Sequence, residues 1–204
     1  MGNQTKHIFK YTAESSQKLR KKLVGHPGMV VWLTGLSGAG KSTISFALEK
    51  RLLETGGLTY CLDGDNLRLG INENLGFSEE DRSENVRRIA HIARLFQDAG
   101  FIVIVACISP ASHMRENAKQ IIGTENFLEV YVKADINTCQ LRDPKGLYKK
   151  VQNGEIKNFT GISAAYEEPA QPDIVLDTEK IKVDDSVEYL FSEITKRVEW
   201  MDKP

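Results

Sequence analysis

Short apolar runs alternate with longer segments of helical periodicity along most of this chain. Continuous runs rich in β-branched residues predict buried strands over 29–34, 58–62, 101–108, 127–132 and 174–176. Apolar residues at helical spacing predict helices over 41–55, 78–99, 112–122, 136–142 and 183–198. Ser78 is expected to cap the second of these helices, and Gly100 to end it.

The alternation of strands and helices predicts an α/β fold with three αβα layers and a mostly parallel central sheet. In such sheets, ligands bind beyond the carboxyl ends of the strands. Residues 29–204 are expected to form a single domain, preceded by an N-terminal arm over 1–28. The polar segment 143–172 interrupts the alternation of strands and helices. A connection of that length is usually functional or disordered.

Composition narrows the classes of function. With 204 residues, 41% of them hydrophobic, the chain can bury one substantial core. Its net charge of -1 offers no basic field for nucleic acid. Residues 1–28 contain no apolar run of signal-peptide length, and no later stretch approaches the length of a membrane span. We therefore expect no nucleic-acid or membrane partner and a cytoplasmic protein. The three cysteines and four histidines lack metal-site spacing, so we expect reduced thiols and no histidine ligand set.

A glycine-rich turn between the first strand and the first helix gives the strongest chemical signal. The sequence Gly35-Leu36-Ser37-Gly38-Ala39-Gly40-Lys41-Ser42 matches the phosphate-binding loop G-x-x-x-x-G-K-[ST] in its required context. Backbone N–H groups of such a loop surround phosphate oxygens, the lysine reaches the β and γ phosphates, and the serine can hold Mg²⁺. The residues predicted to bind ATP here are Gly35, Leu36, Ser37, Gly38, Ala39, Gly40, Lys41, Ser42 and Thr43.

A GTPase switch uses the same loop, so a nucleotide-gated binding protein is the competing class. Its base-reading signature is Asn-Lys-x-Asp, whereas the nearest match here, Val132-Lys133-Ala134-Asp135, lacks the asparagine. The D-x-x-G sequence at 143–146 follows this segment instead of preceding it. A kinase is therefore favoured, and its acceptor is open at this point.

Two carboxylates follow the second predicted strand, in Asp63-Gly64-Asp65-Asn66. The expected sheet order places them next to the phosphate loop. Asp63 could hold Mg²⁺ or accept a hydroxyl proton, and Asp65 could contact the acceptor. Taken alone, the same residues are ordinary turn chemistry.

Several motifs together resemble the adenylylsulfate kinase family, a group of P-loop kinases. They are the phosphate loop, Leu62-Asp63-Gly64-Asp65-Asn66, Leu75-Gly76-Phe77-Ser78, Ile108-Ser109-Pro110, Lys145-Gly146-Leu147-Tyr148-Lys149-Lys150 and Phe159-Thr160-Gly161-Ile162. The resemblance implies transfer of the γ-phosphoryl group of ATP, with Mg²⁺, to the 3′-hydroxyl of adenosine 5′-phosphosulfate. The products would be 3′-phosphoadenosine 5′-phosphosulfate and ADP, in sulfate assimilation. A P-loop kinase for another small hydroxyl compound is the alternative.

The resemblance also implies roles for individual residues. Phe77 and Phe159 would sandwich the adenine of the acceptor, and segment 143–172 would be a mobile lid that excludes water. Ser109 matches a position sometimes regarded as a phosphoserine; we interpret it as an acceptor-site or helix-capping residue and keep the covalent role as a minor alternative. The catalytic set would be Asp63, Lys41 and Ser109, and the metal would be held by Ser42 and Asp63. Arg142 would join the ATP site, and the acceptor would contact Asp65, Arg68, Phe77, Arg82, Asn85, Ile108, Ser109, Lys145 and Phe159.

Two positions depart from the family pattern in the lid. Asn158 stands where glycine is frequent, and Ser163 stands where the family commonly has aspartate. The resemblance further implies a homodimer and a functional pairing with ATP sulfurylase, the enzyme that supplies the acceptor.

Overall fold

The computed structural model describes residues 14–198 and 200. Its strands are β1 (Met29–Thr34), β2 (Thr59–Asp63), β3 (Ile102–Ala106), β4 (Phe127–Lys133) and β5 (Ile174–Asp177). Its helices are α1 (Glu14–Val24), α2 (Lys41–Glu54), α3 (Gly64–Arg68), α4 (Glu79–Asp98), α5 (Ser112–Ile122), the 3₁₀ turn η2 (Thr124–Asn126), α6 (Ile136–Arg142), α7 (Leu147–Gln152) and α8 (Val183–Arg197).

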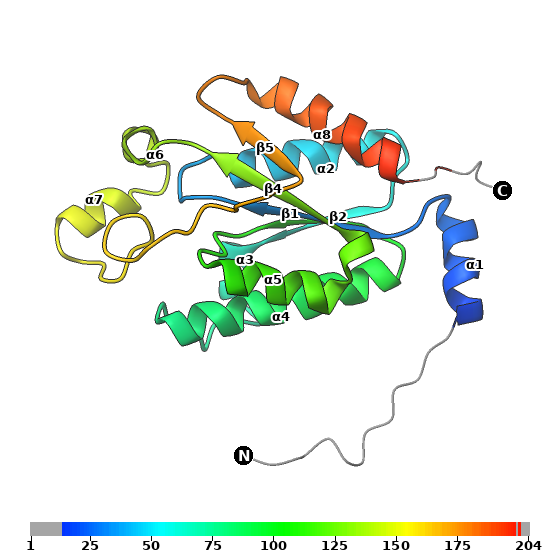
Figure 1. Cartoon of the computed structure of the whole chain (residues 1–204), viewed down its shortest axis with the longest axis horizontal. Helices are drawn as coiled ribbons and strands as arrows, with labels where there is room; N and C mark the ends of the chain where they lie inside the picture. Colours follow the sequence, from blue (N-terminus) through cyan, green and yellow to red (C-terminus); the bar gives the residue numbers. More distant parts are fainter. Residues whose placement is uncertain (1–13, 199, 201–204) are drawn as a thin grey trace, which may run out of the picture.

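The five strands form one sheet in the order β2-β3-β1-β4-β5, and every neighbouring pair is parallel. Helices α2 and α8 cover one face, and α4 and α5 cover the other (Figure 1). The predicted three-layer α/β fold is therefore confirmed. Helices α6 and α7 lie together beyond one end of the sheet, and α1 lies at the opposite end (Figure 1).

Strand β1 is central because both of its faces are apolar. Val31 and Leu33 face the core under α2 and α8, while Val30 and Trp32 face the core under α4 and α5. All six residues of β1 are buried, as expected for a parallel strand covered on both sides. This packing fixes the end of β1 from which the phosphate loop starts.

Local signals correctly predict several element boundaries. The hydroxyl of Ser78 accepts a hydrogen bond from the N–H of Asp81 at 3.1 Å, so Ser78 caps α4. Gly100, with φ 103°, follows the end of that helix. The prediction for the third strand is too long, because β3 ends at Ala106 and its apolar continuation turns into the site loop.

Three short helices were not predicted. Helix α7 lies inside the polar segment 143–172, and α3 follows directly from the carboxylates after β2. Helix α1 lies in the proposed N-terminal arm, where Arg20 donates to the carbonyl of Asp98 at 2.7 Å. Residues 1–13 of that arm lie outside the described residues. Within the described range, no helix is long and apolar enough to cross a bilayer.

Candidate active site

The phosphate loop connects β1 to α2 through three glycines with positive φ. The φ angles are 151° at Gly35, 80° at Gly38 and 104° at Gly40, which caps the helix. A Cβ atom on Gly35 would lie 2.3 Å from the carbonyl oxygen of Val132. Both steric room and backbone conformation therefore require glycine at Gly35.

Lys41 is folded back across the loop. Its Nζ atom donates to the carbonyls of Gly35 and Leu36, both at 2.8 Å. Desolvation lowers the pKa of this amine from its usual value to about 8, and the nearby Asp65 carboxylate partly opposes that shift. A phosphate bound beside Lys41 would raise this pKa again, because its oxygens stabilise the protonated amine.

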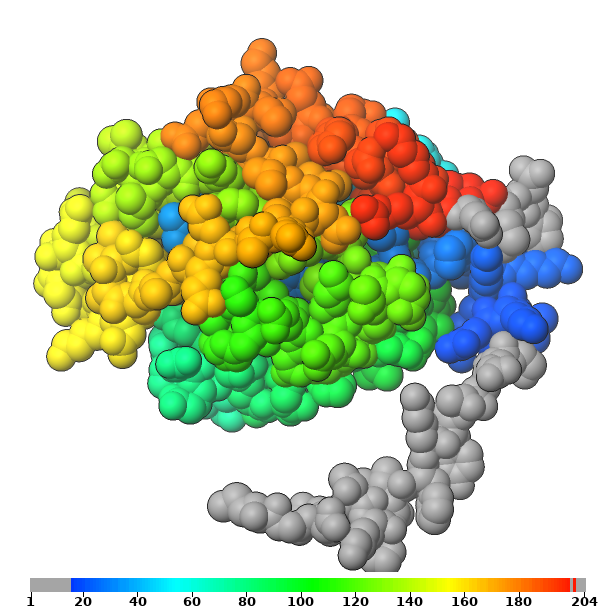
Figure 2. Space-filling view, viewed as in Figure 1, coloured from blue at the N-terminus to red at the C-terminus, as the bar shows by residue number. Residues whose placement is uncertain are grey.

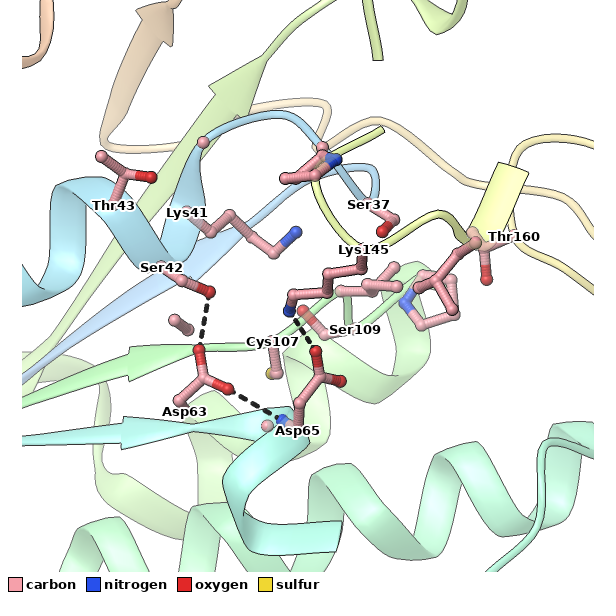
Figure 3. A pocket seen from close by; sticks show the side chains of 18 of the residues that line it. Ser37, Lys41, Ser42, Thr43, Asp63, Asp65, Cys107, Ser109, Lys145 and Thr160 are labelled. Carbon is pink, nitrogen blue, oxygen red and sulfur yellow. Dashed lines mark hydrogen bonds and ion pairs between the residues drawn. The ribbon is translucent and has the colours of Figure 1, made fainter. Parts of the chain in front are cut away.

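Asp63 joins the loop to the second strand. Its Oδ2 atom accepts a hydrogen bond from the Ser42 hydroxyl at 2.7 Å (Figure 3). Its Oδ1 atom accepts the N–H groups of Asp65 at 3.0 Å and Asn66 at 3.4 Å, so the carboxylate also caps α3. Asp63 therefore makes the hydrogen bonds of a turn residue with Oδ1, while Oδ2 faces the phosphate loop, as the predicted metal or proton-accepting role requires.

The Ser42 and Asp63 oxygens suit the metal that the motif implies. Mg²⁺ takes oxygen ligands and is commonly held by one or two protein groups together with substrate phosphates. A hydroxyl and a buried carboxylate 2.7 Å apart, beside the loop, fit this description. Elsewhere in the described chain, no group of three or more His, Cys, Asp or Glu side chains could hold a metal.

One cavity of about 790 Å³ collects most of the predicted site residues. They include Lys41, Ser42, Asp63, Asp65, Arg68, Phe77, Arg82, Asn85, Ile108, Ser109, Arg142, Lys145 and Phe159. Ser37, Gly38, Gly40 and Thr43 also line it, whereas Gly35, Leu36 and Ala39 do not. Residues predicted to bind the donor and residues predicted to bind the acceptor therefore line the same cavity.

Phe159 and Phe77 form different kinds of wall. Phe159 is buried and packs edge-on against Tyr148, with ring centroids 4.9 Å apart, so it belongs to the core as well as to the cavity. Phe77 is exposed, and the guanidinium carbon of Arg68 lies 4.4 Å from its ring centroid. Phe77 thus offers its face to a planar cation, as it could to a base.

Arg82 joins the lid to α4. It donates through Nε to the carbonyl of Phe77 at 2.9 Å, and through its two terminal nitrogens to Thr160 and to the carbonyl of Asn158. Asn85 accepts a hydrogen bond from the buried Asn72 amide at 3.0 Å, which orients it. Hydrogen bonds within the protein therefore hold Arg82 and Asn85, two of the residues predicted to bind the acceptor, in place.

The two departures in the lid have structural explanations. Asn158 has φ 57°, a left-handed conformation that asparagine tolerates better than most residues other than glycine. Ser163 accepts the N–H of Phe159 at 2.9 Å, a short-range bond that an aspartate oxygen could also make. Both residues support the turn that carries Phe159.

Ser109 lies in the loop after β3, with φ 40°. It is buried, its hydroxyl accepts from Trp32 Nε1 at 3.1 Å, and its carbonyl accepts from Arg115 at 2.9 Å. Helix α5 has Ala111 as its N-cap, so the helix-capping interpretation of Ser109 is wrong. Next to it, the carbonyl of Ile108 accepts from the Thr34 hydroxyl at 2.6 Å.

The lid reaches both sides of the cavity. Lys145 points toward Asp65 and pairs with it (Figure 3), and the Tyr148 hydroxyl donates to the carbonyl of Ser37 at 2.8 Å. At the base of the lid, Arg142 donates to the hydroxyl and the carbonyl of Thr178, both at 2.9 Å. Segment 143–172 is therefore bonded to the phosphate loop and to the acceptor side.

Sequence reasoning missed several lining residues. Beyond the carboxyl end of β5, the cavity is lined by Thr178, Ile181, Val183 and Ser186. The rule that ligands bind at carboxyl ends of strands could have indicated this segment. Thr160 and Cys107 were also missed; burial raises the pKa of the Cys107 thiol to about 12. All three cysteines are free and buried.

Comparisons with known proteins agree with this geometry. The family model for adenylylsulphate kinase matches residues 27–177. An adenylyl-sulfate kinase of Staphylococcus epidermidis is 50% identical over 188 residues, covering 92% of this chain and 94% of the relative. One of Phocaeicola vulgatus is 55% identical over 175 residues, covering 86% of each chain.

A solved structure extends the agreement to three dimensions. The Mycobacterium tuberculosis APS kinase, in complex with AMPPNP and APS, is 43% identical, with a TM-score of 0.80 over 82% of this chain and 98% of that one. The family-model match over residues 27–177 includes the phosphate loop, both carboxylates and the lid. The chain belongs to the adenylylsulfate kinase family.

Proposed function

We propose that this protein transfers the γ-phosphoryl group of ATP to the 3′-hydroxyl of adenosine 5′-phosphosulfate, giving 3′-phosphoadenosine 5′-phosphosulfate and ADP. The observation that carries the proposal is the shared cavity, which Lys41 lines on the donor side and Phe159 on the acceptor side. Both nucleotides can then be bound at the same time, and the phosphoryl group can pass directly from one to the other. Membership of the family supports the choice of acceptor.

The donor binds at the phosphate loop. Backbone N–H groups and the positive end of α2 face its phosphates, and Lys41 changes partners from the Gly35 and Leu36 carbonyls to the β and γ phosphates. Mg²⁺ bound near Ser42 and Asp63 would neutralise charge on the phosphate oxygens. Arg142 and Thr178 border the donor side of the cavity, where the ATP base can lie.

The acceptor binds on the opposite side. Phe159 and Phe77 offer aromatic faces to its adenine, while Arg68, Arg82 and Lys145 supply positive charge for its phosphate and sulfate oxygens. The Ser109 hydroxyl accepts a hydrogen bond from Trp32 Nε1, because an indole N–H can only donate. Its own O–H can therefore donate a hydrogen bond to adenosine 5′-phosphosulfate.

The reaction is a direct in-line displacement. The 3′-oxygen forms a bond to the γ-phosphorus as the bond from that phosphorus to the β–γ bridging oxygen breaks, which leaves ADP. Asp63 is oriented for this step, because its Oδ1 atom is fixed by two backbone N–H groups while Oδ2 faces Ser42. Oδ2 is the atom that accepts the proton of the 3′-hydroxyl. Lid closure keeps water from the γ-phosphoryl group.

An acceptor panel with coupled ADP detection tests this function. Mg-ATP with adenosine 5′-phosphosulfate should yield the 3′-phosphorylated product, and replacement of ATP by GTP should reduce the rate. Turnover with a different hydroxyl compound alone would overturn the acceptor assignment. Slow hydrolysis without acceptor stimulation, together with guanine preference, would favour a nucleotide-gated binding protein.

The remaining expectations concern the setting of the enzyme. We propose a cytoplasmic homodimer that works beside ATP sulfurylase, which supplies the acceptor. The support is the family resemblance alone. Sedimentation of the purified chain tests the dimer, and coupled assays with added ATP sulfurylase test the pairing through a shortened lag in product formation.

A further inference from the structure

Helix α5 begins without a cap from its own flanking residues. Ala111 occupies the N-cap position in an extended conformation, with φ -105° and ψ 146°, but its side chain has no oxygen to offer. The N–H of Ser112 donates instead to Glu167 Oε2 at 2.7 Å, from a residue 55 positions later in the chain. A cap usually comes from the adjacent residue, so this one joins two distant segments.

Glu167 ends the short segment 164–167, which we call the strap. The N–H of Glu167 donates to the carbonyl of Pro110 at 2.8 Å. The Tyr166 hydroxyl lies 3.1 Å from Thr34 Oγ1. The Thr34 hydroxyl uses its own proton to donate to the carbonyl of Ile108. Tyr166 must therefore be the donor to Thr34.

The strap continues directly from the turn that carries Phe159. The N–H of Gly161 donates to the carbonyl of Ala164 at 2.8 Å, and the N–H of Ala164 donates to the carbonyl of Phe159 at 3.0 Å. In the space-filling view, the chain in yellow to orange runs from the lid along the green surface of α5 (Figure 2). One end of the strap thus holds the aromatic wall of the cavity.

The other end of the strap holds the loop that carries Ser109. Helix α5, which Glu167 caps, contributes the buried Arg115, whose Nη1 atom donates to the carbonyl of Ser109. Arg115 also pairs with Glu129 on β4 at 3.0 Å, so its orientation is fixed. The strap and α5 therefore connect the two walls between which the acceptor is proposed to bind.

We propose that Glu167 and Tyr166 are positioning residues that fix the Phe159 turn against the Ser109 loop and so preform the acceptor half of the cavity. Neither residue is among those that line the cavity, so both act through the groups they hold. The kinetic part of this inference rests on the proposed function. The structural part, a link between the lid and α5, does not.

The competing explanation is that Glu167 only stabilises α5. Two variants separate the explanations. Glu167→Ala removes both the helix cap and the link, whereas Glu167→Ala combined with Ala111→Ser restores a neutral cap at the adjacent position and leaves the link broken. Ala111→Ser alone is the matched control. Glu167 is exposed, so these variants should fold.

We expect Glu167→Ala to raise KM for adenosine 5′-phosphosulfate about fivefold, the order of factor that the loss of one linking hydrogen bond gives, with KM for ATP within about twofold. In the double variant, the melting temperature should recover while the acceptor KM stays high. Tyr166→Phe should shift the acceptor KM in the same direction. Recovery of the acceptor KM together with the melting temperature, or an equal rise in both KM values, would overturn the positioning role.

Hydrogen exchange without any nucleotide tests the link separately from the proposed function. In the double variant, amides of residues 159–164 should exchange faster than in the wild type, while α5 regains its protection. Unchanged exchange at 159–164 would overturn the link, even if the enzyme uses adenosine 5′-phosphosulfate. Conversely, faster exchange in a protein with no activity on that acceptor would retain the link and refute the function.

Discussion

The donor and acceptor halves of the cavity are built in different ways. The donor half is nearly continuous in sequence: the nine-residue stretch 35–43 holds the residues predicted to bind the phosphates of ATP, and six of them line the cavity. The acceptor half is assembled from residues 63–85, 108–110 and 145–160, which meet through the sheet and the lid. A local motif can therefore identify the donor half, whereas the acceptor half exists only in the folded chain.

The halves also differ in how their side chains are held. The phosphate loop relies on backbone geometry, with positive φ at Gly35, Gly38 and Gly40. The acceptor half relies on long-range side-chain bonds, such as Arg82 to Thr160 and Lys145 to Asp65. Substitutions should accordingly affect ATP binding and acceptor binding separately, except at the boundary between the halves.

Asp63 lies at that boundary and should give the largest effect. Asp63→Asn keeps an oxygen that can cap α3 but removes the negative charge beside Ser42. We expect turnover to fall by about 10²–10³-fold, because the lost charge acts mainly in the transition state. Turnover comes from steady-state kinetics, and the dissociation constant for ATP, measured by calorimetry without acceptor, should change only a few-fold. Turnover that survives within a few-fold would remove Asp63 from the catalytic set.

Phe159 should affect the acceptor half alone. Loss of base stacking is worth about 1–3 kcal/mol, so KM for adenosine 5′-phosphosulfate should rise about 5- to 150-fold. Phe159 also packs against Tyr148, and Phe159→Ala would leave a hole in the core. Phe159→Leu is the sharper variant, since it retains apolar volume and removes the aromatic face. An unchanged acceptor KM in Phe159→Leu would return this residue to a packing role.

Lys41 should make the donor half sensitive to pH. Because burial lowers its pKa to about 8, the free enzyme loses this positive charge as pH rises through 8. ATP binds the protonated form, so its dissociation constant should rise toward about tenfold for each pH unit above that value. Calorimetric titrations between pH 7 and pH 9.5 measure the slope. Lys41→Arg is the control: arginine stays protonated, so its affinity for ATP should be flat over this range.

The same contrast explains what the sequence could predict. The strands, the main helices and the phosphate loop follow from apolar periodicity and glycine spacing, which are local properties. The carboxylates after β2 could be placed near the loop only because parallel strands end at one edge of a sheet. The links from Arg115 to β4, from Glu167 to α5 and from Thr178 to the phosphate loop could not be predicted, since each joins segments whose approach depends on the complete fold.

Two of the three missed helices have a related cause. Helix α7 has six residues and α3 has five, too short to show a full apolar period. Helix α7 is held by Asp143, which accepts the N–H groups of Tyr148 and Lys149, both at 3.1 Å. Such helices are stabilised by capping and tertiary contacts more than by intrinsic propensity.

Asn158 should give the smallest effect and tests whether the lid turn depends on its backbone alone. The residue is exposed and has φ 57°, and Arg82 binds its carbonyl, not its side chain. Asn158→Gly should therefore leave both KM values within about twofold and barely change stability, because glycine adopts this conformation readily. Asn158→Ala should destabilise the turn by about 1 kcal/mol, since a Cβ atom with no polar group disfavours positive φ. Thermal unfolding and acceptor KM measure the two outcomes. If both variants raised the acceptor KM equally, the Asn158 side chain itself would contribute to acceptor binding, and the acceptor half would extend one residue further along the lid.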